Sequence, residues 1–171
     1  MYSEGEYVIY GMNGVCRVNG ITTLDFDDVP KDLEYYVLFS ENNGGKIYVP
    51  VDIGESNMRR VITKAEAEEL IAKMPLIEPI IVNNEKLAEE TYKKCFRCFD
   101  CTEWIKLIKY IYHRKQQRLS SGKKITATDE KYMHMAEDAL YSELGIALDI
   151  PKEQVLDYIL KMLGSKSILT P

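Results

Sequence analysis

The chain has few of the residues that dominate catalytic sites. Its 171 residues include only two histidines, His113 and His134, and neither has an obvious nucleophile beside it in the sequence. The glycine-rich phosphate loops of nucleotide-binding proteins and the H-E-x-x-H motif of metalloproteases are also missing. We therefore expect a binding protein and not an enzyme, with no small-molecule substrate and no cofactor.

Long hydrophobic runs and a dispersed cysteine framework are missing as well. No stretch approaches the roughly 18 apolar residues of a membrane span, and the N-terminus lacks the basic and apolar regions of a secretory signal. Three of the four cysteines lie together between residues 95 and 101, unlike the spread-out cysteines of secreted disulfide proteins. These features predict a cytoplasmic protein with reduced thiols and no membrane partner.

The charges are distributed unevenly along the chain. Residues 1–79 carry 7 basic and 14 acidic side chains, whereas residues 80–171 carry 15 basic and 13 acidic ones. The segment from Trp104 to Lys124 holds seven lysines and arginines and no acid. Such a stretch favours polyanions, although a solvated helix face gives the same pattern.

The first fifty residues show the alternation that is typical of short strands. Apolar and polar positions alternate between breaks rich in glycine and asparagine, and an acidic loop spans residues 25–32. The expected strands are Tyr7–Tyr10, Val15–Thr23, Glu34–Ser40 and Lys46–Val49. They predict a small antiparallel β-barrel or sheet.

Helical periodicity begins at Thr63, where Thr63-Lys64-Ala65-Glu66 has the form of a capping box. The expected helices cover residues 63–74, 83–100, 102–119, 126–148 and 151–163, with a linker at 75–79. The predicted fold class is therefore α+β, with a β module at residues 1–62, an all-α helical domain at 63–165 and a flexible tail at 166–171.

Two stretches are candidate interfaces. The segment Lys46–Val49 could be an open edge strand that pairs with the sheet of a partner protein. In the helix at 102–119, an apolar stripe that includes Trp104 is expected to be core, leaving Lys106, Lys109, Arg114 and Lys115 towards water. The predicted DNA-contacting residues are Lys109, Arg114, Lys115, Arg118, Lys123 and Lys124.

Cys95, Cys98 and Cys101 permit two interpretations. On one helix the spacing i, i+3, i+6 would place the three thiols on a single stripe, where they could hold a metal ion or a cluster. The alternative is three small apolar side chains in a buried helix face, because cysteine is among the most buried residue types.

The chain resembles the CarD/CdnL family of bacterial RNA polymerase-binding transcription regulators. In the N-terminal half the similarity lies in Glu4–Tyr10, Asn13-Gly14-Val15, Glu34–Leu38 and Ile47–Pro50. In the helical half, Ile108–Arg118 is similar to the basic helix of the family, and Ala136–Ala147 to the helix that follows it.

The resemblance implies a Tudor-like N-terminal module, shared with the transcription-repair coupling factor, that pairs with the polymerase β subunit through Lys46, Ile47, Tyr48, Val49 and Leu24. It also implies a helical module that contacts promoter DNA just upstream of the melted region and stabilises the open complex. The chain departs from the family in the β module, where proline is usual at Gly11, histidine at Asn13 and often a basic residue at Tyr48.

The helix expected at 83–100 departs further from the family. Glu85 stands where relatives that open the DNA minor groove have tryptophan, and Glu89 and Glu90 where basic DNA contacts are expected. Because carboxylates repel phosphates, an adaptor on RNA polymerase that does not bind DNA is the second hypothesis. A metal or redox sensor built on the cysteines is the third.

Overall fold

The computed structural model describes residues 1–25, 33–42 and 44–164. The chain divides into two compact units, Met1–Val61 and Ile62–Pro171, called here the β unit and the helical unit. The expected tail at 166–171 and most of the acidic loop at 25–32 lie outside the described residues.

The β unit is a five-stranded antiparallel sheet in the order β4-β3-β2-β1-β5. Its strands are β1 (Tyr7–Tyr10), β2 (Val15–Thr23), β3 (Glu34–Ser40), β4 (Lys46–Pro50) and β5 (Met58–Arg60). A short 3₁₀ turn, η1 (Gly11–Asn13), joins β1 to β2, and α1 (Val51–Asn57) joins β4 to β5. The four strands expected from alternation are confirmed, and the α+β class with them.

The core of the β unit is small and is closed by α1 and the N-terminus. Its buried residues are Val8, Cys16, Val18, Tyr36, Leu38, Val49 and Met58. A Cβ atom on Gly54 would lie 3.2 Å from the Tyr36 ring, so the glycine allows α1 to pack closely on this ring. The Tyr2 hydroxyl donates to the Met58 carbonyl at 3.1 Å, which ties the N-terminus to β5.

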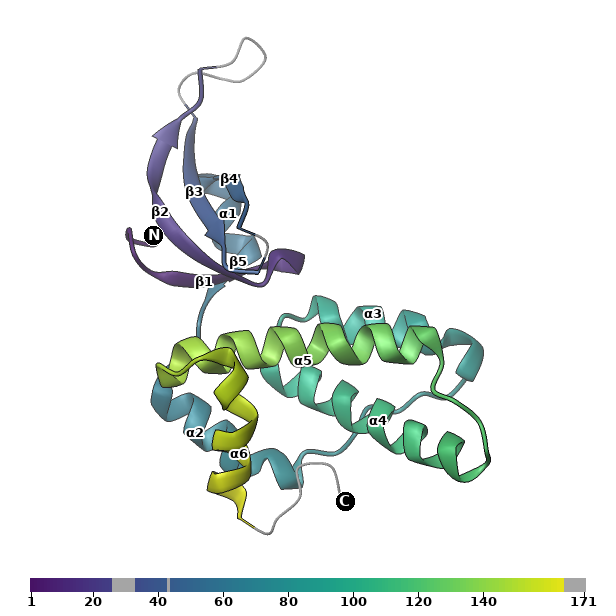
Figure 1. Cartoon of the computed structure of the whole chain (residues 1–171). Coiled ribbons are helices and arrows are strands. Elements are labelled where there is room, and N and C mark those ends of the chain that lie inside the picture. The colour runs from purple at the N-terminus through teal and green to yellow at the C-terminus, as the bar shows by residue number, and fades with distance from the viewer. Residues whose placement is uncertain (26–32, 43, 165–171) are drawn as a thin grey trace. The chain divides into compact units, whose positions relative to one another are not determined.

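The helical unit contains five α-helices among its described residues. They are α2 (Lys64–Lys73), α3 (Ala88–Arg97), α4 (Cys101–Ser120), α5 (Ala127–Leu148) and α6 (Val155–Leu163). Three 3₁₀ turns, η2 (Met74–Leu76), η3 (Glu85–Leu87) and η4 (Lys152–Gln154), connect them. The long α5 contacts each of the other four α-helices of this unit (Figure 1).

Side-chain caps set where these helices begin. The predicted capping box of Thr63 and Glu66 opens α2, and the Thr126 hydroxyl accepts from the Asp129 amide at the start of α5. The predicted extent of the helix at 83–100 is wrong, because α3 ends at Arg97. Phe99 then adopts a left-handed φ of 49°, and Asp100 caps α4.

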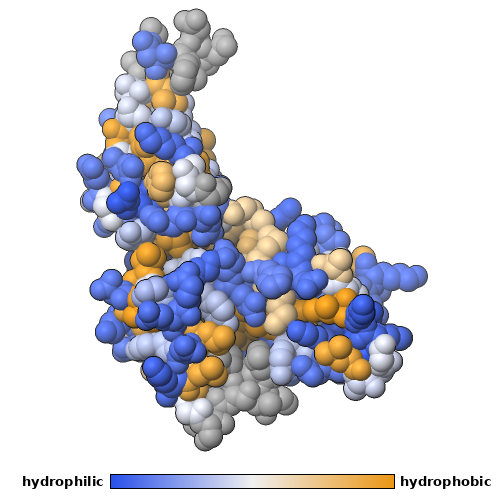
Figure 2. Space-filling model, viewed as in Figure 1, coloured by the Kyte–Doolittle hydropathy of each residue, from blue (hydrophilic) through white to orange (hydrophobic). Residues whose placement is uncertain are grey.

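Hydrophobic side chains interrupt the hydrophilic surface of both units on the face drawn in Figure 2. The exposed ones in the β unit include Met12, Ile21, Tyr48 and Ile53, and those in the helical unit include Leu76, Ile81, Leu87, Leu119, Leu156 and Leu160. None of the described helices is both long and apolar enough to cross a lipid bilayer.

Candidate functional site

Strand β4 forms one edge of the sheet. Among the described residues it pairs only with β3, in a register that sets Lys46 opposite Phe39 and Val49 opposite Tyr36. Its backbone groups on the outer side are therefore available to another strand.

Side chains along β4 alternate between the two faces of the sheet. Lys46 and Tyr48 are exposed, Ile47 is half-buried and Val49 lies in the core at 2% exposure. Leu24 is half-buried and follows the end of β2, so it is not part of the β4 edge. Of the five residues assigned to polymerase contact, only Lys46 and Tyr48 present freely exposed side chains.

Lys109 is a buried structural residue. The expectation that it faces water is wrong, because only 3% of the residue is exposed. Its ammonium donates to the Ile77 carbonyl at 2.8 Å and to the Pro75 carbonyl at 3.4 Å. Burial lowers the pKa of Lys109, opposed in part by the charge of Glu78.

Residues 75–79, expected to be a linker, are instead packed along α4. Besides the two bonds from Lys109, the Ile80 amide donates to the Lys106 carbonyl at 3.3 Å, and Ile77 and Ile80 pack against the core. The lysine satisfies the carbonyls that follow α2, which turns the segment into a fixed part of the helical unit.

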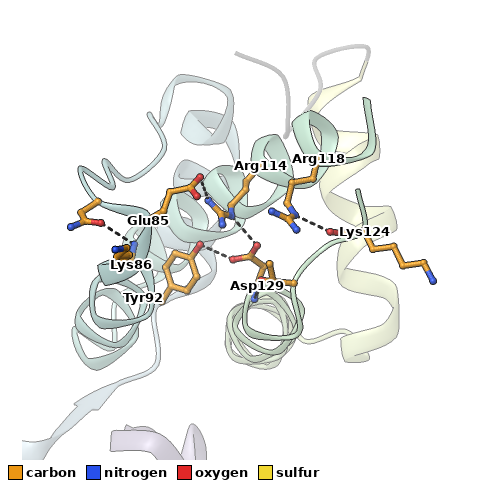
Figure 3. A network of polar contacts seen from close by, with 9 residues as sticks. Glu85, Lys86, Tyr92, Arg114, Arg118, Lys124 and Asp129 are labelled. Carbon is orange, nitrogen blue, oxygen red and sulfur yellow. Dashed lines mark hydrogen bonds and ion pairs between the residues drawn. The ribbon is translucent and has the colours of Figure 1, made fainter. Parts of the chain in front are cut away.

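Arg114 stands at the centre of an internal polar network that joins η3, α3, α4 and α5 (Figure 3). Its guanidinium donates to Asp129 Oδ2 at 2.9 Å and to Glu85 Oε1 at 2.7 Å. Tyr92 donates to the other Asp129 oxygen at 2.8 Å, and Asp129 is 2% exposed. The guanidinium on α4 therefore bonds to both η3 and α5 and holds these three helices together.

The pKa values of the network residues follow from this geometry. Burial and the hydrogen bond to Asp129 raise the pKa of the Tyr92 hydroxyl. Burial disfavours the charged form of Arg114, but the bonds to Asp129 and Glu85 outweigh it and raise the pKa of the guanidinium. Both groups therefore keep their protons near neutral pH.

Arg118 fixes the turn that follows α4. Its Nε donates to the Lys124 carbonyl at 2.8 Å (Figure 3), and the Lys123 amide donates back to the Arg118 carbonyl at 2.8 Å. Gly122 adopts a φ of 70°, as a Schellman-type helix end requires. The side chains of Lys123 and Lys124, called here the lysine turn, are exposed, and Lys115 is half-buried.

The carboxylates of α3 are partly neutralised within their own helix. Lys93 lies 2.9 Å from Glu90 Oε1 and 3.5 Å from Glu89 Oε1. The hydrogen bond from Lys93 lowers the pKa of Glu90. The surface of α3 is thus a mixed charged face, in contrast to the lysine turn, where the described residues provide no acidic partner.

The comparison with protein-family models gives a match to the CarD-like/TRCF RID domain over residues 2–62. The β unit is therefore similar to this domain family and is called the RID domain below. RID domains are RNA polymerase-interacting domains of transcription proteins. The match ends where the helical unit begins, and a comparison with curated proteins gave no match.

Outside the RID domain, the three clustered cysteines occupy different environments. Cys95 belongs to α3, Cys98 follows it and is exposed, and Cys101 opens α4 and donates to Glu143 Oε2 at 3.1 Å. The single helix that would align the thiols is interrupted at Phe99. Within the described ranges, no three histidine, cysteine or carboxylate side chains could hold one metal ion.

We expect one thiol per chain to react rapidly with iodoacetamide at neutral pH, and peptide mass spectrometry to locate it at Cys98. Burial raises the pKa of Cys16 in the RID domain and of Cys95 to about 11, and Cys101 is buried. All four thiols should react after unfolding. Slow reaction of Cys98 that a chelator accelerates would instead indicate a bound metal.

Proposed function

We propose that the chain is a non-enzymatic transcription regulator that docks on the β subunit of bacterial RNA polymerase through the β4 edge of its RID domain. It would act in the cytoplasm and would use the lysine turn to contact promoter DNA and modulate open-complex stability. The RID match combined with the open β4 edge is the observation that carries this proposal.

Strand addition explains why the edge suits a protein partner. An added strand gains affinity from main-chain hydrogen bonds and specificity from alternate side chains. On β4 these side chains are Lys46 and Tyr48, and tyrosine is enriched at the energetic centres of protein interfaces. Val49 contributes by anchoring the strand to the core, where it faces Tyr36.

We expect the double substitution Lys46→Glu/Tyr48→Ala in the full chain to weaken binding to the isolated polymerase β subunit by more than about tenfold. The substitutions remove the exposed side chains of β4 without touching the core. Surface plasmon resonance on the immobilised subunit measures the effect.

Arg17→Glu is the matched control for this experiment. Arg17 lies on β2 and is exposed. It pairs with Phe39 of β3, which in turn pairs with Lys46, so Arg17 is in the same cross-strand row as Lys46 but away from the edge. Equal losses for Arg17→Glu and the β4 variant would argue against docking at the edge.

The DNA part of the proposal rests on the lysine turn. Lys123 and Lys124 are exposed, and their backbone is held by the Arg118 bonds. A cationic turn with a fixed backbone suits phosphate contacts, which position a protein on DNA without reading sequence.

We expect Lys123→Gln/Lys124→Gln to reduce the slope of log K against log salt for a promoter duplex by about 2, since each phosphate contact contributes about 1. Gel-shift titrations at several salt concentrations measure this slope. Lys64→Gln/Lys161→Gln, at exposed lysines of α2 and α6, is the charge-matched control.

An adaptor that does not bind DNA is the second candidate function. It is favoured by the internal positions of Lys109 and Arg114 and by the carboxylates of Glu89 and Glu90 on α3. Polymerase binding that depends on β4, together with a duplex affinity that the lysine-turn substitutions leave unchanged, would select the adaptor.

A further inference from the structure

An open groove runs beside α4 in the helical unit. Its floor is one face of the helix, formed by Tyr110, His113, Arg114 and Gln117 at the spacing i, i+3, i+4, i+7. The segment Glu78–Ile81 forms a wall, and Glu85 completes the lining. The cavity measures about 520 Å³, which is enough for several side chains of a partner.

The wall at Glu78–Ile81 is held in place yet displays an apolar side chain. The bonds from Lys109 to Ile77 and from Ile80 to Lys106 fix its backbone on α4. Ile80 and Val82 turn inward against the core, while Ile81 between them points outward and is 80% exposed. This isoleucine contributes little to the core of its own unit, and it is available to a ligand.

The charge of the groove is acidic. Its one arginine, Arg114, is bound by Asp129 and Glu85 and has a side chain only 14% exposed. Glu85 keeps a side-chain exposure of 77% despite this ion pair, and Glu78, which also lines the groove, is exposed. A phosphate in the groove would meet two carboxylates, whereas a cation would be attracted by them.

We propose that this groove binds a segment of a partner protein that carries basic and apolar side chains. The basic groups would lie between Glu78 and Glu85, and an apolar side chain would cover Ile81. Gln117, exposed at one end of the floor, supplies an amide that can bond to the backbone of an extended segment. None of the lining residues belongs to the RID domain or to the lysine turn.

The test uses the ¹⁵N-labelled full chain and a short probe peptide of alternating lysine and leucine. We expect chemical-shift changes confined to residues 78–87 and 110–117. Ile81→Ser and Glu78→Lys should each weaken binding at least about tenfold. Leu156→Ser and Glu153→Lys, exposed positions on α6 and on η4 before it, should leave the affinity unchanged.

Several results would overturn the proposal. They are no binding of the lysine–leucine peptide, equal binding of a glutamate–leucine peptide, shifts located elsewhere, or insensitivity to both groove variants. Shifts of the groove residues on adding a DNA duplex would point to nucleic acid and also contradict it. Because no readout involves polymerase, the outcome is independent of docking at β4.

Discussion

Replacing Arg114 by alanine should lower the free energy of unfolding of the helical unit by about 3–5 kcal/mol, the usual cost of removing one partner from a buried ion pair. The substitution leaves the carboxylate of Asp129, which is 2% exposed, with only the Tyr92 hydroxyl as a described side-chain partner. Urea unfolding followed by circular dichroism measures the change.

Controls separate this network from general effects of charge. Lys115→Ala removes a neighbouring cation that is only half-buried and should cost less than about 1 kcal/mol. In a double-mutant cycle, Arg114→Ala and Asp129→Ala should be far from additive, because each disrupts the same pair. Additive effects, or a loss below about 1 kcal/mol for Arg114→Ala, would contradict the structural role.

Lys109→Ala should destabilise the helical unit by about 2–4 kcal/mol, from unsatisfied carbonyls at Pro75 and Ile77 and from the lost packing of the buried stem. The loss should be accompanied by faster amide exchange in residues 75–80, which Lys109 holds on α4. Hydrogen exchange with mass spectrometry detects both local and global effects.

The control for Lys109 is Lys106→Ala on the same helix. Lys106 is half-exposed and pairs with Glu103 at 2.7 Å, an arrangement worth about 0.3–0.5 kcal/mol. If the two variants unfold at the same denaturant concentration, the Lys109 ammonium does not hold the segment. If Lys109→Ala weakens DNA binding at unchanged stability, the lysine is a surface contact after all.

The structural role of Arg114 limits which substitutions can be used to test DNA binding. Replacing Arg114, Lys115 and Arg118 together by glutamate would place a carboxylate beside Asp129 and would be expected to unfold the network. Any loss of DNA affinity would then report loss of structure. The lysine turn offers substitutions that change charge at exposed positions only.

Local signals predicted most of the secondary structure. Alternation located four strands, and the capping box at Thr63 located the start of α2, because both signals depend on neighbours in the chain. Strand β5 was missed because three residues are too few for a period and its pairing with β1 is long-range. The end of α3 depends on the left-handed φ of Phe99, which its residue type does not favour.

The basic stretch presents fewer free cations to solvent than its sequence suggests, because tertiary contacts engage several of them. Four of its seven cations are engaged inside the unit: Lys106 with Glu103, Lys109 with carbonyls about thirty residues earlier, Arg114 with Asp129 and Glu85, and Arg118 with the Lys124 carbonyl. Glu103 stands one residue before the acid-free window. The formal charge counted along a sequence thus includes cations that form ion pairs or hydrogen bonds within the fold.

The most direct test of polymerase docking is hydrogen exchange of the full chain with and without the RNA polymerase β subunit. We expect the amides of residues 46–49 to become protected in the complex, because an added strand bonds to the free edge of β4. Unchanged exchange at 46–49, with protection appearing at β5 or only in the helical unit, would contradict docking through this edge.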